Sequence, residues 1–148
     1  KIKCWGQNDK GQLGYQDWET RANGPSEMGD DLPYVDVGTG RTVKKMADWF
    51  GPATCVILDD DSLTCWGSNA AGVLLGTEQS MQTIGGQAGQ MGDNLPIVDL
   101  GTGRTVKQVS LWDDHACAVL DNGLLKCWGI ANYGVLGTGN GDNADVGG

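Results

Sequence analysis

The feature that most constrains the fold of this chain is an internal repeat. The tripeptide Cys-Trp-Gly starts at residues 4, 65 and 127, so successive copies lie 61 and 62 residues apart. The stretch Gly-Thr-Gly-Arg-Thr-Val-Lys occurs unchanged at residues 38–44 and 101–107. A fixed period of this length is typical of stacked structural units, none of which can bury its apolar face alone. We therefore expect residues that recur once per unit to be scaffold, and functional residues to lie where the units differ.

Each unit also carries an insertion that is too long for a tight turn. Met-Gly-Asp occurs at residues 28–30 and 91–93, and Leu-Pro-x-Val-Asp follows at residues 32–36 and 95–99. Because the insertion recurs in register, it belongs to the repeat, and we expect the parts on which both copies agree to be scaffold.

The composition favours a turn-rich β fold, because the chain has 25 Gly and 6 Trp but only 1 Phe. The formal net charge is −9, with 10 Lys and Arg among 19 Asp and Glu. Nucleic-acid binding needs clustered cations that displace counterions from phosphates, so it is not expected. Adhesion to an anionic membrane is disfavoured for the same reason. No apolar run approaches the roughly 18 residues of a membrane-spanning helix, so we expect no direct insertion, whereas association with a membrane complex stays compatible.

The five cysteines follow the same period. Cys55 precedes Cys65 by ten residues, and Cys117 precedes Cys127 by ten residues. By the same spacing, the partner of Cys4 would lie outside the chain. Each pair encloses two short apolar stretches around a turn, which predicts two β-hairpins.

Turn chemistry sets the register of both hairpins. Gly123 in Asp-Asn-Gly adopts a left-handed conformation readily, and Asp61 has the same place in the first hairpin and tolerates that conformation. A three-residue loop then puts each cysteine opposite its partner. Opposed residues have Cα atoms about 4.5 Å apart, near the lower limit for a disulfide. We therefore expect the disulfides Cys55–Cys65 and Cys117–Cys127.

Disulfides would place the chain in an oxidising, extracytoplasmic compartment: secreted, on a cell surface, in the periplasm or in an organelle lumen. Reduced cysteines that serve as small core residues are the alternative. A zinc site agrees poorly with a spacing of ten residues and a single histidine, because zinc modules use shorter ligand spacings. We therefore expect no metal site.

Each unit is predicted to contain four short antiparallel strands. Residues 32–37 include Pro33, which is typical of an edge strand, and residues 42–49 alternate loosely as an inner strand. The cysteine hairpin supplies the other two strands. Four such strands per unit indicate a β-propeller blade. The predicted fold class is therefore all-β, with about two complete blades plus fragments of two more.

The chain forms a single repeat region over residues 1–148. Residues 1–6 are predicted to be the last strand of a preceding blade, residues 7–67 and 68–129 to be two blades, and residues 130–148 to start a further blade. Two blades cannot close a ring, and open sheet edges invite pairing. We therefore expect a segment of a longer repeat protein, or a chain that neighbouring subunits complete.

Two stretches resemble the repeat of the regulator of chromosome condensation family, the RCC1 type. Residues 5–14 run Trp-Gly-Gln-Asn-Asp-Lys-Gly-Gln-Leu-Gly and are similar to the Trp-Gly signature of that repeat. Residues 109–129 contain its His-bearing strand and Asp-Asn-Gly turn. The resemblance covers essentially the whole chain and implies part of a seven-bladed β-propeller. For the family prototype it implies nucleotide exchange on the small GTPase Ran and chromatin binding.

The sequence departs from that family pattern in its paired cysteines and its long insertions. These departures indicate a disulfide-bearing, extracytoplasmic branch, and the acidity argues against nucleotide exchange or chromatin binding. A plant ultraviolet-B photoreceptor shares the fold, but its Gly-Trp-Arg-His-Thr motif is absent here. A secreted bacterial member inhibits β-lactamases, which implies that the fold can bind proteins outside cells.

No catalytic constellation stands out. His115, the only histidine, has a strand position of the repeat and is expected to make a structural hydrogen bond. Residues 38–42 lack the Lys, the spacing and the helix of a phosphate loop, so a turn is expected. Residues 59–61 lack the alternating ligand spacing of a calcium loop and are expected to form an exposed acidic turn. We therefore predict no catalytic residue, no metal and no cofactor.

The aromatic residues fall into two groups. The tryptophans of Cys-Trp-Gly, predicted to pack between blades, are Trp5, Trp66 and Trp128. The other group occurs once each, on or near loops, and exposed Trp and Tyr are typical anchors of protein interfaces. These candidates for partner binding are Tyr15, Trp18, Tyr34 and Tyr133.

Together these features predict a non-enzymatic propeller module that binds a protein, or that serves as an extrinsic or scaffold subunit of a larger assembly. Partners would meet the insertion loops, residues 15–31 and 77–93, or the open blade edges. The alternative is a guanine-nucleotide exchange or chromatin-binding propeller of the same family. An enzyme is a further alternative, but no nucleophile–base pair or paired carboxylates support it.

Overall fold

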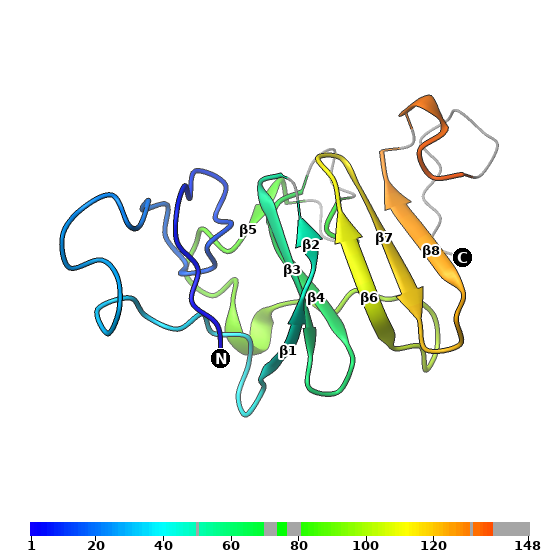
Figure 1. Ribbon diagram of the computed structural model, residues 1–148, viewed down its shortest axis with the longest axis horizontal. Helices are drawn as coiled ribbons and strands as arrows, with labels where there is room; N and C mark the ends of the chain where they lie inside the picture. Colours follow the sequence, from blue (N-terminus) through cyan, green and yellow to red (C-terminus); the bar gives the residue numbers. More distant parts are fainter. Residues whose placement is uncertain (50, 70–73, 77–80, 131, 138–148) are drawn as a thin grey trace.

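The computed structural model describes residues 1–49, 51–69, 74–76, 81–130 and 132–137. Within these residues the chain is nearly all β and forms two four-stranded sheets side by side (Figure 1). The first sheet has the strand order β1-β3-β4-β5 and the second β2-β6-β7-β8. The strands are β1 (Val43–Met46), β2 (Asp48–Trp49), β3 (Ala53–Leu58), β4 (Leu63–Ser68), β5 (Thr83–Ile84), β6 (Val106–Leu111), β7 (His115–Leu120) and β8 (Leu125–Gly129).

Two short 3-10 helices complete the regular elements of the described residues: η2 (Gly92–Asn94) and η3 (Asn132–Gly134). In the part of the chain that the structure describes, no helix has the length and apolarity needed to cross a membrane.

The two cysteine hairpins form in the predicted register. β3 pairs with β4, and β7 with β8, so that each cysteine lies opposite its partner. Both turns contain the left-handed residue that was predicted, with φ of 65° at Asp61 and 84° at Gly123. These residues close the turns alike, because the N–H of Asp61 donates to the carbonyl of Leu58 and that of Gly123 to the carbonyl of Leu120, both at 3.0 Å.

The predicted inner strand at residues 42–49 divides into two. β1 pairs with β3 of its own sheet, with a bulge between Val43 and Lys45. β2 instead pairs in parallel with β6 of the second sheet, where Trp49 lies opposite Leu111. This short parallel pair lies outside the predicted antiparallel pattern and ties the two sheets together.

The predicted edge strand at residues 32–37 is wrong, because the structure has an extended segment there and no strand. Val35 is buried, and its N–H donates to the carbonyl of Ile2 at 3.0 Å. Pro33 has no N–H to donate, so a regular ladder does not develop from that residue.

The fourth strand of the first sheet is β5, which follows the second Cys-Trp-Gly in sequence. β5 pairs with the end of β4, where Gly67 lies opposite Ile84. One sheet therefore takes strands from both sides of the predicted boundary at residue 67. The boundary at residue 67 therefore marks the period of the sequence, and the division of the chain into two blades at that residue stays a prediction.

One hydrophobic core joins the two sheets. β3 of the first sheet contacts β6 of the second, and their buried side chains belong to a single cluster. Burial of an aliphatic side chain of this size contributes about 1.5–3 kcal/mol, so stacked units stabilise one another. The largest fully buried side chains include Trp66, Ile57, Leu63, Leu74, Leu75, Ile84 and Leu120.

Candidate interaction surfaces

Both predicted disulfides are present. Cys55 and Cys65 are bonded with their Cα atoms 4.1 Å apart, and Cys117 and Cys127 with their Cα atoms 4.0 Å apart. Cys4 is free and half-buried, and burial raises its pKa to about 11. Its thiol is therefore protonated near neutral pH, and a protonated thiol is a poor nucleophile.

Two of the three recurring tryptophans pack against the turn that follows the previous Cys-Trp-Gly. Trp66 is fully buried and donates its indole N–H to the carbonyl oxygen of Gln12 at 3.0 Å. Trp128, also buried, donates in the same way to the carbonyl oxygen of Leu74 at 3.0 Å. Trp5 differs from both, because 58% of it is exposed.

Tyr15 and Trp18 hold the first insertion loop in place. The hydroxyl of Tyr15 accepts the N–H of Cys4 at 3.0 Å, and its one proton is shared between the carbonyl oxygens of Cys4 and Pro33, at 2.9 and 3.0 Å. The ring of Trp18 lies against Gly86, where a Cβ atom would sit 2.3 Å from the ring. Tyr15 is therefore engaged within the chain, whereas Trp18 packs on Gly86 and is still 43% exposed, so its predicted role in partner binding stays a prediction.

Tyr34 and Tyr133 project from the surface. Tyr34 is 57% exposed, and the ammonium groups of Lys3 and Lys1 lie 4.7 and 5.3 Å from the centre of its ring. Tyr133 is fully exposed and has a left-handed backbone, with φ of 60°. The four aromatic candidates therefore do not form one surface.

A buried asparagine organises the insertion, and the sequence interpretation missed it. Asn8 is fully buried, accepts the N–H of Leu13 and donates to Asp17. Asn69 repeats this arrangement by accepting the N–H of Leu75 at 2.9 Å. The signal was available, because both residues stand two positions after the Gly of Cys-Trp-Gly.

Asp17 also binds the guanidinium group of Arg21, which belongs to the same loop. Arg21 forms an ion pair with Asp17 at 2.7 Å. Burial acts to raise the pKa of Asp17, but the hydrogen bonds from Arg21 and from the N–H of Glu19 outweigh it, so the pKa is lowered. The charge of Arg21 is therefore largely neutralised from within the loop.

The acidic turn at residues 59–61 is paired with a cation of its own unit. Arg41 forms ion pairs with Asp59, at 3.3 Å, and with Asp60. Hydrogen bonds from Arg41 and Ser62 lower the pKa of Asp60 well below its ordinary value. The pairing holds the Gly-Thr-Gly-Arg turn against the hairpin.

His115 and the Gly-Thr-Gly turn also lie in structural contacts. The Nδ1 atom of His115 is 3.1 Å from a carboxylate oxygen of Asp114, a neighbour that the sequence interpretation had not paired with it. In the turn, the N–H of Thr39 donates to Asp93 at 2.6 Å. Among the described residues, no three His, Cys, Asp or Glu side chains gather in a way that could hold a metal ion.

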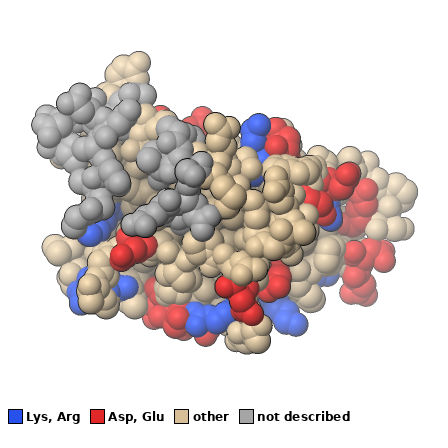
Figure 2. Space-filling view, turned by 180° about the vertical axis from the view of Figure 1, so that it is seen from behind, with Lys and Arg blue, Asp and Glu red and all other residues tan. Residues whose placement is uncertain are grey.

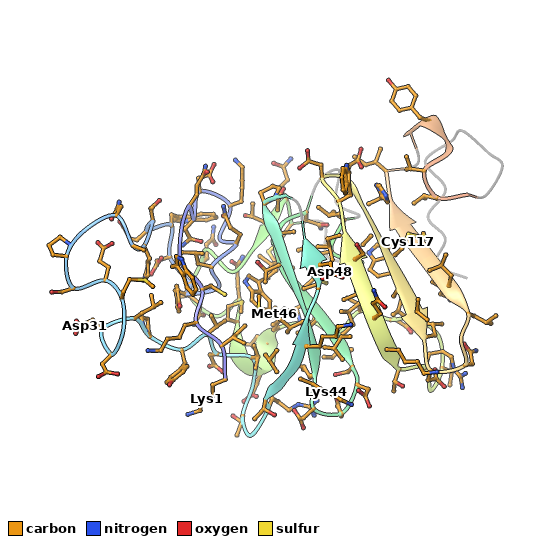
Figure 3. All side chains as sticks on the ribbon, viewed as in Figure 1. Lys1, Asp31, Lys44, Met46, Asp48 and Cys117 are labelled. Atoms are coloured by element: carbon orange, nitrogen blue, oxygen red, sulfur yellow. A yellow bond between two sulfur atoms is a disulfide. The ribbon has the colours of Figure 1, made fainter. Side chains whose placement is uncertain are left out.

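The surface charges show no basic face in the view of Figure 2, where Lys and Arg side chains lie beside Asp and Glu. In Figure 3 the first insertion loop extends away from the sheets, with Asp31 on it. Of the second insertion loop, residues 77–80 lie outside the described residues. The first loop is therefore the better-defined candidate surface.

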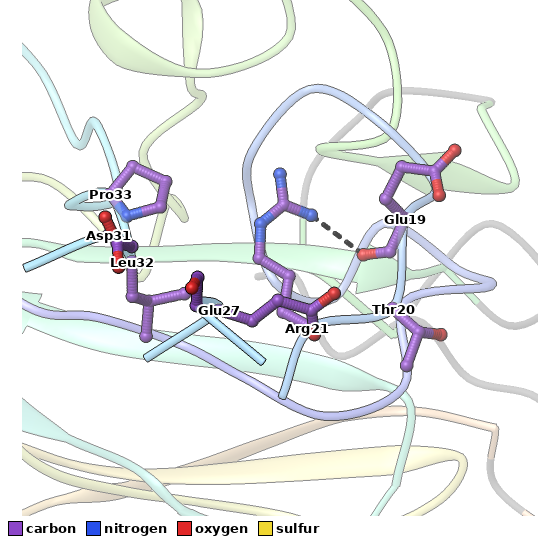
Figure 4. A pocket seen from close by; sticks show the side chains of 8 residues that line it. Glu19, Thr20, Arg21, Glu27, Asp31, Leu32 and Pro33 are labelled. Carbon is purple, nitrogen blue, oxygen red and sulfur yellow. Dashed lines mark hydrogen bonds between the residues drawn. The ribbon is translucent and has the colours of Figure 1, made fainter. Parts of the chain in front are cut away.

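A pocket of about 220 Å³ opens on this loop (Figure 4). Glu27, on its wall, accepts the N–H groups of Asn23 and Gly24 through one carboxylate oxygen. Because the positive charge of Arg21 is paired with Asp17, the remaining charged groups of the pocket are carboxylates. Leu32 and Pro33 form its apolar side. The lining residues are Glu19, Thr20, Arg21, Ser26, Glu27, Asp31, Leu32 and Pro33.

Residues 106–135 match the profile of the Regulator of chromosome condensation (RCC1) repeat. The chain is also 28% identical over 144 residues to the E3 ubiquitin-protein ligase HERC2 of Homo sapiens and to that of Mus musculus. These alignments cover 96% of this chain but only 3% of either relative.

Two solved structures share the fold. Prp20p from Saccharomyces cerevisiae, described with its binding properties to Gsp1p and histones, matches 86% of this chain and 28% of its own, with a TM-score of 0.57 and 21% identity. Yeast RCC1 (Prp20) bound to Kap60 matches 95% of this chain and 30% of its own, with a TM-score of 0.64 and 19% identity. The matched segment therefore carries an RCC1-type repeat, the chain as a whole is similar to RCC1-type repeat proteins, and it shares the β-propeller fold of the two solved structures.

Proposed function

We propose that this chain is a non-enzymatic module that binds a protein partner, or serves as a structural subunit of a larger assembly, in an oxidising compartment. The observation that carries the proposal is the pair of cross-strand disulfides, which occur at the same place in both hairpins. Disulfides persist where thiols are not kept reduced. The net charge of −9 favours a protein partner over a nucleic acid.

The partner surface in this proposal is the first insertion loop, residues 15–31, with Tyr34 beside it. An exposed tyrosine can supply a large contact area at an interface. Glu19, Glu27 and Asp31 line the pocket of the loop and complement a Lys or Arg side chain of the partner. The apolar side of the pocket suits the aliphatic stem of such a side chain.

Site-specific photo-cross-linking in the native compartment tests this surface. A photoreactive residue at position 34 should capture one defined protein, and Glu19→Gln with Asp31→Asn should reduce the yield. The same probe at position 112, which is 58% exposed just after β6 and lies outside both proposed surfaces, is the matched control. Equal capture at both positions would overturn the proposed surface. So would a cross-linking yield that Glu19→Gln and Asp31→Asn leave unchanged.

The alternative function is guanine-nucleotide exchange or chromatin binding, and the fold shared with Prp20p is the observation that favours it. Incubation of the chain with Gsp1p loaded with a fluorescent nucleotide tests the first activity, and co-sedimentation with histones tests the second. Stimulated nucleotide release, or saturable histone binding, would support the alternative. Absence of both, with the disulfides intact in the native protein, supports the extracytoplasmic module.

A further inference from the structure

β4 and β8 are the second strands of the two cysteine hairpins, but they differ in what lies outside them: β4 pairs at its end with β5, whereas β8 is the last strand of its sheet. Leu63 at the start of β4 is 1% exposed, whereas Leu125 at the start of β8 is 64% exposed. Both residues follow a hairpin turn and pair alike, Leu63 with Ile57 and Leu125 with Val119. Since the local structure is the same, the difference in exposure must come from what lies outside each edge.

Residues 95–98 cover the edge of β4. The N–H of Val98 donates to the carbonyl oxygen of Leu63 at 2.9 Å. The hydroxyl of Thr64 donates to the carbonyl oxygen of Pro96 at 2.8 Å. This cover is the Leu-Pro-x-Val part of the second insertion, and it accounts for the burial of Leu63.

Both copies of the insertion in this chain are used as covers. The first copy places Val35 against Ile2, with the N–H···O bond of 3.0 Å described above. The second copy adds an isolated bridge between Ile97 and Thr64 to the contacts with β4. In both copies the N–H of the valine therefore donates to the residue two positions before a Cys-Trp-Gly, Ile2 for the first copy and Leu63 for the second, although residues 1–5 form no strand.

The Met-Gly-Asp that precedes the second cover makes a further contact with a Gly-Thr-Gly turn. Asp93 accepts the N–H of Thr39 at 2.6 Å and its hydroxyl at 2.8 Å. The turn around Thr102 has the same conformation: the glycines that flank Thr39 have φ of 116° and 71°, and those that flank Thr102 have φ of 106° and 69°. Thr102 is exposed, and its donors have no acceptor among the described residues.

We infer that the outer edge of β8, together with Thr102, is a docking site for an extended segment of the sequence Met-Gly-Asp-x-Leu-Pro-x-Val-Asp. The segment lies against Leu125 as residues 95–98 lie against Leu63, and its first aspartate accepts two hydrogen bonds from Thr102. This is recognition by strand addition, in which backbone bonds supply affinity and side-chain contacts supply specificity. The inference does not depend on the proposed partner surface at residues 15–31.

A labelled synthetic peptide with the sequence of residues 91–100 is the probe, titrated with the intact chain by fluorescence anisotropy. We expect saturable binding and a change in the methyl NMR signals of Leu125, with those of Leu63 unchanged. A peptide with Asn in place of its first Asp should bind roughly tenfold more weakly, because it loses charge-assisted hydrogen bonds. A shift at Leu63 alone would show that the peptide exchanges with the internal cover, and would overturn the inference.

Variants of the chain locate the site. Leu125→Asp should abolish binding, whereas Met46→Asp, on the exposed edge strand β1 of the other sheet, should leave it unchanged. Thr102 is exposed, so Thr102→Ala should leave the fold intact. The variant should bind the parent peptide only as weakly as the unchanged chain binds the Asn peptide, and its own affinity for the Asn peptide should equal that of the unchanged chain. Thr39→Ala is its control, because that turn is already engaged by Asp93. Absence of saturable binding up to about 1 mM peptide, or equal loss in the control variants, would overturn the inference.

Discussion

Trp66 of β4 donates its indole N–H to the carbonyl oxygen of Gln12, which lies 54 residues earlier in the chain. Trp128 of β8 makes the same bond to Leu74, again 54 residues earlier. A buried Trp contributes a large apolar area, and its N–H needs a partner once it is removed from water. The recurring tryptophan therefore joins each hairpin to the turn that follows the preceding Cys-Trp-Gly.

Trp66→Ala should destabilise the fold by about 3–5 kcal/mol, because it removes a fully buried aromatic side chain. Trp5→Ala is the matched control, since the same residue type in the same motif is 58% exposed there, and we expect a loss below about 1 kcal/mol. Urea unfolding followed by circular dichroism measures both. Similar losses for the two variants would contradict the assigned role of Trp66.

Gly14→Ala should be more destabilising than Gly40→Ala. Both glycines have left-handed backbones, with φ of 75° and 71°, so the backbone strain of about 1–2 kcal/mol is shared. A Cβ at Gly14 would lie 2.8 Å from the indole nitrogen of Trp66, whereas a Cβ at Gly40 meets open space. The difference between the two midpoints of urea unfolding isolates the packing effect, and equal midpoints would exclude it.

Removal of one disulfide, as Cys117→Ala with Cys127→Ala, should lower stability by about 2–3 kcal/mol, because the bond closes a loop of about ten residues in the unfolded chain. Cys4→Ala is the control variant, since Cys4 is free. Peptide mapping without reductant should recover the 55–65 and 117–127 bridges from the native protein. Free thiols at all five cysteines would contradict both the pairing and the oxidising compartment.

Stability should decrease in acid. The pKa of Asp60 is lowered by hydrogen bonds from Arg41, and that of Asp93 by hydrogen bonds from Thr39. A carboxyl group with a lowered pKa stabilises the fold above its unfolded pKa, and this stabilisation is lost as the pH falls through the folded pKa. We expect a constant melting temperature above about pH 5 and a fall below it.

Thermal unfolding between about pH 2 and pH 7 measures this dependence. Asp60→Asn should lower the melting temperature near neutral pH and make its decrease in acid less steep. Asp31→Asn is the control, because Asp31 makes no ion pair among the described residues, and it should retain the slope. An unchanged slope in Asp60→Asn would show that Arg41 does not control this titration.

Cys4 should react slowly with thiol reagents. Burial raises its pKa to about 11, so its thiolate fraction at pH 8 is roughly a hundredfold below that of an ordinary cysteine. Alkylation of the native protein with iodoacetamide, followed by mass spectrometry, measures the rate. Addition of urea should remove the difference, and rapid alkylation of the native protein would contradict the burial of the thiol.

The hairpins were predictable because their determinants are local. The left-handed residues Asp61 and Gly123 set the loop length, and the loop length alone places the cysteines opposite one another. The paths of residues 32–37 and 42–49 were not predictable in the same detail. Val35 bonds to Ile2 and β2 pairs with β6, both in other units, so these parts of the path depend on how the units stack.

The aromatic candidates show the same limit. Sequence position alone grouped Tyr15 with Tyr34, because both are single aromatics near a loop. The structure separates them, since the hydroxyl of Tyr15 is bound by the backbone of Cys4 while Tyr34 stays exposed. Exposure depends on the neighbours that long-range folding brings, and these neighbours leave no local signal.

The sequence by itself determined the repeat, the β-hairpins, the disulfide pairs and the RCC1-type signature, because a repeated motif can be read directly from the chain and turn chemistry acts over a few residues. Only the tertiary structure decided which copies of a repeated residue are buried. Leu63 and Leu125 have the same local setting, but residues 95–98 cover the first and leave the second exposed. A stacked unit buries its edge only against another unit, so contacts across the stack, and not local sequence, decide where the surface of this protein lies.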